Sequence, residues 1–346
     1  MLKYKKKTKS ASDISRTITK INISQLDSKN SADQKQQQVI ISGFIEISLY
    51  KSPHHYNGRC QRLCSKEDRT WKERVFNQTK LDEVNSSQRN HASVWLRKIA
   101  ASMNFGIDTY ALSVDLLDRF LATLKVRPKF LECLAVGCLY IAAKCKEEDD
   151  TISITPEFVI DCNATCSANE LLRMERLVLE KFDWFIDFVT AIDFLQIYSA
   201  LLLLKVENQA EENNEKAIVE KYIDLEIKLA SCLQHHRLAS FKPRILALAL
   251  VSLEFEKQQA QESEMNTDWL ASITFLQELA NVESDALLSC RDLIVRLLPS
   301  YKVVRLELSD LTFISHAYKP LKPLMNLSDR PTYADVVCGR TFPIVQ

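Results

Sequence analysis

Apolar residues recur at helical spacing between residues 111 and 121. Val114, Leu117 and Leu121 follow one another at intervals of three and four residues, which places them on one face of an α-helix. Asp118 falls among these core positions. The pattern therefore predicts a carboxylate within a helix that is otherwise built for burial.

The run from residue 130 to residue 144 is apolar around almost its whole circumference. It is also rich in small residues, namely Ala135, Gly137, Ala142 and Ala143. A helix without a polar face is normally enclosed by other helices. We therefore predict the central helix of a bundle, ending at Lys144.

A further helix is predicted to begin at Ser167. Glu170 follows three residues later, and Ser and Glu at this spacing form a capping box at the start of a helix. Leu171 and Met174 then continue an apolar face at helical spacing. Glu175 therefore lies within an apolar helix.

Composition favours an all-α fold in two domains. The chain has 346 residues, of which 46% are hydrophobic, and this is enough apolar surface for two cores. Only five Gly and nine Pro argue for long helices with few tight turns, and long β-branched alternating runs are scarce. After Trp184 the helical pattern restarts, which predicts a second bundle.

Two segments resemble the cyclin box, the helical domain of the cyclin family. They are LLDRFLATLKVRPKFLECLAVGCLYIAAKCKEEDD at residues 116–150 and ELLRMERLVLEKFDW at residues 170–184. The positions that characterise the box are occupied here by Arg89, Trp95, Asp118, Lys144 and Glu175. The stretches LLDRFLA, LRMER and LALALVSLE, together with the acidic loop KCKEEDD, resemble the G and I branch of the family.

The resemblance covers roughly residues 70 to 300 and implies two tandem cyclin-box helical bundles. We assign the N-terminal box to residues 70–186 and a C-terminal cyclin-like box to residues 187–300. Residues 1–69 are predicted to form a basic, mostly disordered arm, and residues 301–346 an irregular tail. Within the arm, KKKTK is either a nuclear localisation signal or a solubilising tail, and residues 39–50 are either a short strand or a docking segment.

The resemblance implies two different roles for the charged residues of the box. In cyclins the Lys and the Glu pair at the surface that meets a kinase, which implies kinase binding for Lys144 and Glu175. The apolar anchors implied beside them are Leu179, Trp184 and Ile186. The family's Arg and Asp form a buried structural pair, which implies a role in the fold for Arg89 and Asp118.

The first helix of the box differs from that of mitotic and S-phase cyclins. Those proteins carry an apolar MRAIL motif that docks Arg-x-Leu peptides, whereas residues 88–93 read QRNHAS here. Docking of such peptides is therefore not expected. We interpret Trp95 as a core anchor, because aromatic side chains dominate protein cores.

Neither catalysis nor a cofactor is expected. The sequence has no Gly-rich phosphate loop, no GxSxG and no HExxH motif. Lys144 and Glu175 could form an acid and base pair, but no nucleophile, oxyanion site or metal is predicted near them. His54, His55, Cys60 and Cys64 fit no standard zinc spacing, so we predict a polar loop there and no metal site.

The cysteines and the hydropathy predict a soluble, intracellular protein. Most cysteines lie in helical core runs, where free thiols behave as small hydrophobic groups: Cys133, Cys138, Cys145, Cys232 and Cys290. The sequence has neither a long uncharged apolar stretch nor a secretory signal. Basic and acidic residues both number 45, so net charge indicates neither membrane nor nucleic-acid binding.

Three functional hypotheses follow from the resemblance. The first is a non-catalytic regulatory subunit that binds a cyclin-dependent kinase in cell-cycle or growth control, located in the nucleus and the cytoplasm. The second is an adaptor that recruits protein phosphatase 2A or other regulators, as implied by the G branch. The third is a cyclin-fold transcription factor, which would need a basic face that the mixed charge of the boxes does not provide.

Overall fold

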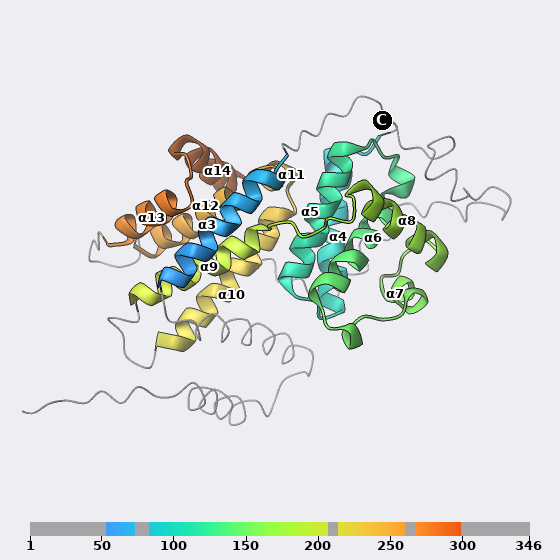
Figure 1. Ribbon diagram of the computed structural model, residues 1–346, viewed down its shortest axis with the longest axis horizontal. Coiled ribbons are helices and arrows are strands. Elements are labelled where there is room, and N and C mark those ends of the chain that lie inside the picture. The colour runs from blue at the N-terminus through green and yellow to red at the C-terminus, as the bar shows by residue number, and fades with distance from the viewer. Residues whose placement is uncertain (1–52, 73–82, 207–213, 260–267, 299–346) are drawn as a thin grey trace, which may run out of the picture. The chain divides into compact units, whose positions relative to one another are not determined.

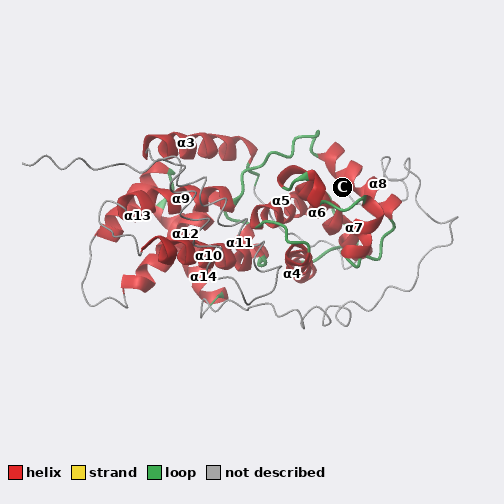
Figure 2. Ribbon diagram, turned by 90° about the horizontal axis from the view of Figure 1, so that it is seen from below, coloured by secondary structure: helices red, strands yellow, loops and turns green. Residues whose placement is uncertain are grey.

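The computed structural model describes residues 53–72, 83–206, 214–259 and 268–298. All regular elements in these ranges are helices (Figure 2), which confirms the all-α prediction. None of the helices described is both long enough and apolar enough to cross a membrane. The predictions for KKKTK, for residues 39–50 and for the tail at 301–346 lie outside the described residues.

The first helical group surrounds a central helix, α6 (Figure 1). It consists of α4 (Ser86–Ser102), α5 (Ile107–Thr123), η1 (Pro128–Phe130), α6 (Leu131–Lys146), η2 (Asp149–Thr151), α7 (Thr155–Asp161) and α8 (Ala168–Lys181). Helix α6 packs against α4, α5 and α8, and its residues from Leu134 to Ala143 are all buried. This confirms the predicted central helix, since a helix that is apolar on every side needs neighbours on every side.

The second helical group is built around α12. It consists of α9 (Ala191–Val206), α10 (Asn214–Leu233), α11 (His236–Ala239), α12 (Pro243–Gln259), α13 (Asp268–Leu279) and α14 (Ser284–Leu297). Helix α12 contacts α9, α10, α13 and α14, and the run from Leu246 to Val251 is buried without interruption. The chain therefore repeats one arrangement, a central apolar helix enclosed by others.

Helix α3 (Pro53–Thr70) precedes the first group in sequence but packs on α9 and α13 of the second group (Figure 1). The sequence-based assignment of this segment to a disordered arm is therefore wrong. The buried residues Tyr56, Cys60, Cys64 and Glu67 do share one helical face. That face contains a carboxylate and no aliphatic side chain, so it lacks the apolar pattern that identified the other helices.

Charged contacts attach α3 to the start of α12. The Arg244 main-chain NH donates to Glu67 Oε1 at 2.9 Å, and the Arg244 guanidinium lies 3.1 Å from Glu67 Oε2. Arg244 Nη2 and Lys242 Nζ also bond to Asp68 Oδ1, at 2.7 and 2.9 Å. These partners are far apart in sequence, so no local pattern could reveal them.

Candidate functional site

Lys144 and Glu175 form an ion pair between the end of α6 and the middle of α8. The distance from Lys144 Nζ to Glu175 Oε1 is 2.6 Å, and the two side chains are 41% and 13% exposed. Gly137 lets the helices approach, because a Cβ there would lie 3.2 Å from Met174 Cγ, one residue before Glu175. The pair predicted from the resemblance is therefore assembled in the folded chain, at a partly exposed edge.

The start of α8 sets which residues reach that edge. Ser167 Oγ accepts from the Glu170 main-chain NH at 3.3 Å, and Glu170 Oε2 accepts from the Ser167 main-chain NH at 2.7 Å. This is the predicted capping box. The helix that follows buries Leu171 and Met174 and leaves Leu179 half-buried near its end.

The Lys144 ammonium also lies against an aromatic ring. Its Nζ is 3.9 Å from the centroid of the Tyr140 ring, one turn earlier on α6. The Tyr140 hydroxyl is 3.0 Å from Thr155 Oγ1 at the start of α7. Sequence reasoning missed Tyr140, although its spacing of four residues from Lys144 is a signal for contact on a helix.

The turn after α8 exposes two aromatic side chains. Trp184 is 65% exposed, and its neighbour Phe185 is 48% exposed. Asp183 and Trp184 have φ values of 50° and 60°, a left-handed conformation that is unfavourable for residues other than glycine. The Trp184 main-chain NH donates to Leu179 O at 2.8 Å and so ties the turn to α8.

Of the apolar anchors implied by the resemblance, Trp184 is the exposed one, whereas Leu179 and Ile186 are half-buried. Phe185 was not among the expected site residues. The sequence feature that could have identified Phe185 is its position between two of the anchors, Trp184 and Ile186.

A cluster of aromatic rings packs against the turn after α8. The Phe188 ring lies edge-on to Phe182 and Phe185, with centroid distances of 5.7 and 5.6 Å. The Arg119 guanidinium carbon lies 3.9 Å from the centre of the Phe188 ring, and Arg119 Nη1 donates to Thr70 O at 2.8 Å. The exposed Phe185 therefore packs on a cluster that Arg119 helps to hold in place.

Arg89 and Asp118 lie in the interior and form a bidentate pair. Arg89 Nε and Nη2 donate to the two Asp118 oxygens at 2.6 Å each, and the side chains are 0% and 4% exposed. Arg89 Nη1 also donates to Leu233 O and Gln234 O at the end of α10, at 2.9 and 3.1 Å. The guanidinium thus joins α4, α5 and α10, an arrangement that serves the fold.

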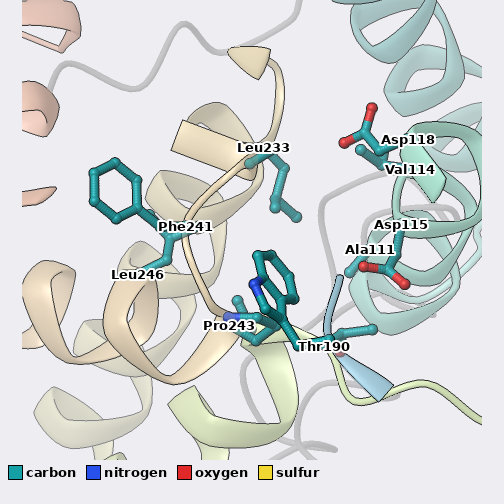
Figure 3. A pocket seen from close by; sticks show the side chains of 12 residues that line it. Ala111, Val114, Asp115, Asp118, Thr190, Leu233, Phe241, Pro243 and Leu246 are labelled. Carbon is teal, nitrogen blue, oxygen red and sulfur yellow. The ribbon is translucent and has the colours of Figure 1, made fainter. Parts of the chain in front are cut away.

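A small cavity lies beside this pair (Figure 3). Asp115 and Asp118 line one side of it, and Leu233 and Phe241 line the other. Its volume of about 20 Å³ accommodates roughly one water molecule. This cavity is too small for an organic ligand.

The residues considered for metal binding lie on α3. His54 and His55 are exposed, whereas Cys60 and Cys64 are buried, so the polar loop predicted there is a helix. Among the described residues, no group of three or more His, Cys, Asp or Glu side chains is placed to hold a metal ion.

The described cysteines are free thiols, but they do not all lie in the core. Cys138, Cys232 and Cys290 are buried as expected, whereas Cys133 is half-buried and Cys145 is exposed. These two lie near the ends of α6, where the enclosure of the central helix is incomplete.

The second group contains a Lys–Glu pair that the sequence did not reveal. Lys228 Nζ on α10 bonds to Asp224 Oδ2 and to Glu254 Oε2 on α12, at 2.5 Å each. The Lys228 side chain is 4% exposed. A partner protein cannot reach this ammonium, so the pair is a packing element and not a second binding surface.

Comparison with known proteins gives a family match and several relatives. Residues 60–187 match the family described as cyclin, N-terminal domain. The chain is 32% identical to cyclin-G1 of Bos taurus over 194 residues, which cover 54% of this chain and 64% of that protein. It is 30% identical to cyclin-I2 of Homo sapiens over 207 residues, which cover 60% and 54%. The chain thus spans less than two thirds of the length of these relatives.

The comparison with solved structures gives a match to the X-ray structure of a viral cyclin from herpesvirus saimiri. The match has 19% identity and a TM-score of 0.49, and it covers 64% of this chain and 90% of the viral chain.

Proposed function

Because this chain contains a cyclin N-terminal domain and resembles the cyclins of the G and I branch, we propose that it is a non-catalytic regulatory subunit of a cyclin-dependent kinase. The observation that carries this proposal is the Lys144–Glu175 pair of 2.6 Å at a partly exposed edge. On the same helix and the turn after it lie the three apolar anchors, Leu179, Trp184 and Ile186. We name these five residues the kinase-facing surface.

The exposure of Trp184 supports a binding role for this surface. A large aromatic side chain that is 65% exposed leaves apolar area in water, and a partner would bury it. Buried Trp side chains at the centre of interfaces often contribute more than 2 kcal/mol to binding, whereas charges at the rim contribute less. We therefore expect Trp184→Ala to weaken kinase binding more than Lys144→Ala does, as measured by calorimetry with the captured kinase.

The regulation would act through conformational populations of the kinase. A subunit that binds the active arrangement of the kinase more tightly shifts the equilibrium toward it by that difference in affinity. The chemistry of phosphoryl transfer then belongs to the partner. A role in cell-cycle or growth control, and a location in the nucleus and the cytoplasm, are parts of this proposal.

A pulldown from cell extract tests the proposal. The wild type is compared with a Lys144→Ala, Glu175→Ala double variant, and partners are identified by mass spectrometry. The matched control is Arg176→Ala with Glu180→Ala, because that pair is also an ion pair of 2.7 Å on α8 but lies outside the kinase-facing surface. Circular dichroism verifies that each variant is folded.

We expect the double variant to lose a cyclin-dependent kinase that the wild type and the control retain. The opposing result is that no sample captures a kinase, while subunits of protein phosphatase 2A are captured by all three. That result would overturn the proposal and favour the alternative of a phosphatase adaptor.

A further inference from the structure

We propose that Tyr140 is a positioning residue of the kinase-facing surface and that its ring holds the Lys144 ammonium in the orientation that a partner meets. The effect of Tyr140 on partner binding rests on the proposed function, whereas its effect on Lys144 does not.

Two groups contact the Lys144 ammonium. Its Nζ is 2.6 Å from Glu175 Oε1 and 3.9 Å from the centroid of the Tyr140 ring. A cation is attracted to the face of an aromatic ring within about 6 Å of the centroid. A lysine ammonium has three donor hydrogens, so the contact with Glu175 leaves donors for a partner.

Without such contacts, the Lys144 side chain would be free to move. Lysine has four flexible side-chain bonds and loses most of their rotamer freedom when it is ordered. Its side chain here is 41% exposed, so surrounding packing alone does not immobilise it. A ring and a carboxylate that order the side chain in the free protein reduce the ordering required on binding.

The Tyr140 ring is itself held in place by α7. Its hydroxyl lies 3.0 Å from Thr155 Oγ1, and its ring centroid is 4.6 Å from that of Phe158, which is fully buried. Tyr140 is 5% exposed, so the ring has little room to turn away from Lys144. Helix α7 thereby supports Lys144 although α7 contributes none of the five residues of the surface.

A role in packing alone makes a different prediction from a positioning role. Any large apolar side chain at residue 140 could fill the same space, but only an aromatic ring offers a face to the ammonium. Tyr140→Phe retains the ring and loses the hydroxyl, whereas Tyr140→Leu loses the ring. Thr155→Val removes the partner of the hydroxyl without touching the ring. These variants separate the contributions of ring and hydroxyl.

The first test uses the natural chain and proton NMR. Protons above the face of an aromatic ring are shifted upfield, so the ε-methylene protons of Lys144 should resonate upfield of those of the exposed Lys181. Lys144→Arg identifies the signal. Equal shifts for Lys144 and Lys181 would overturn the proposal.

The second test measures the rate at which a succinimidyl ester acylates Lys144, by mass spectrometry and relative to Lys181. The reagent must approach the amine, and the ring restrains it, so loss of the ring should raise the relative rate about two- to fivefold in Tyr140→Leu. Tyr140→Phe and Thr155→Val should remain near the wild type. An unchanged rate in Tyr140→Leu, or an equal rise in Tyr140→Phe, would contradict the positioning role.

The pulldown described above completes the test. We expect Tyr140→Leu to capture less kinase than Tyr140→Phe. If Lys144 becomes more reactive while kinase capture is unchanged, the ring does position Lys144 but the proposed contact of Lys144 with the kinase is wrong. If no variant changes either readout, the positioning role itself is refuted.

Discussion

At the residue level, the two ion pairs of the first group differ in how much water reaches them. The Arg89–Asp118 side chains are 0% and 4% exposed, whereas those of Lys144 and Glu175 are 41% and 13% exposed. Removal of one partner from a buried pair leaves an uncompensated charge in the interior. Ion pairs in contact with solvent contribute little to folding. The Arg89–Asp118 pair therefore contributes to the stability of the fold, whereas the Lys144–Glu175 pair is accessible to a partner.

This difference predicts opposite behaviour for two alanine variants. Asp118→Ala should lower the free energy of unfolding by about 3–5 kcal/mol, because Arg89 would remain buried without its carboxylate. Lys144→Ala should change it by less than about 1 kcal/mol. Urea denaturation followed by circular dichroism measures both values. Similar values for the two variants would contradict the assignment of Arg89 and Asp118 to the fold.

A buried carboxylate on α10 predicts a pH dependence. Burial raises the pKa of Glu226 to about 7, and the nearby Asp108 carboxylate acts in the same direction, whereas a hydrogen bond with Tyr222 lowers it. An unfolded Glu has a pKa of about 4.3. The folded chain therefore holds an extra proton between these values, and stability falls as the pH rises from about 4.3 to about 7.

Glu226→Gln removes this titration. The variant should be more stable than the wild type by about 3–4 kcal/mol at pH 8, because each unit of the pKa difference is worth about 1.4 kcal/mol, and the two should converge near pH 4. Thermal unfolding of both proteins across this range provides the measurement. A difference that is independent of pH would show that the carboxylate does not titrate as described.

At the level of elements, the capping box stabilises the N-terminus of α8. Ser167→Ala removes the side chain that accepts from the Glu170 main-chain NH, and such a loss costs about 1 kcal/mol. Ser167→Thr keeps a hydroxyl at the same place and should retain most of the stability. Chemical denaturation distinguishes the two variants, and equal losses would argue against the cap as the cause.

The helices that could be predicted from the sequence are those with strong apolar periodicity. Helices α5, α6 and α8 follow from local spacing, and α6 appears as the predicted central helix. Helix α3 could not be predicted in this way, because its buried face includes Glu67. The hydrogen-bond partner of Glu67 is Arg244, which is 177 residues away.

The burial of single residues could not be predicted from the pattern either. Trp95 is half-buried, while the adjacent Leu96, about 100° further round the helix, occupies the core.

The candidate site was predictable only in part for a similar reason. Lys144, Glu175 and the apolar anchors could be named from the resemblance, because motif residues align by sequence. Phe185 and Tyr140 could not, because their roles depend on three-dimensional placement. The exposure of Phe185 depends on a turn with left-handed residues, and the position of Tyr140 depends on its contacts with α7.

At the level of the whole described chain, α3 connects the two helical groups. Glu67 and Asp68 bind Arg244 of the second group. The same helix also bonds to the first group and to the segment that follows it. The Thr70 carbonyl accepts from Arg119 on α5, and Lys66 pairs with Asp187 after α8. A helix that is bonded to both groups stabilises their association, so its detachment should affect the molecule as a whole.

Arg244→Ala tests this connection in the full chain. Arg244 and Glu67 side chains are 7% and 2% exposed, so the loss of the guanidinium leaves a buried carboxylate without its charged partner and should lower the free energy of unfolding by about 3–5 kcal/mol. Lys242→Ala is the matched control, because Lys242 binds Asp68 at a more exposed position and should cost less than about 1 kcal/mol. Limited trypsin digestion should also cleave α3 faster in Arg244→Ala, after Arg59, Arg62 or Arg69. If the two variants show equal stability and equal cleavage, α3 is not held through Arg244. The groups would then be connected by other contacts, among them the bonds of Arg89 to the end of α10.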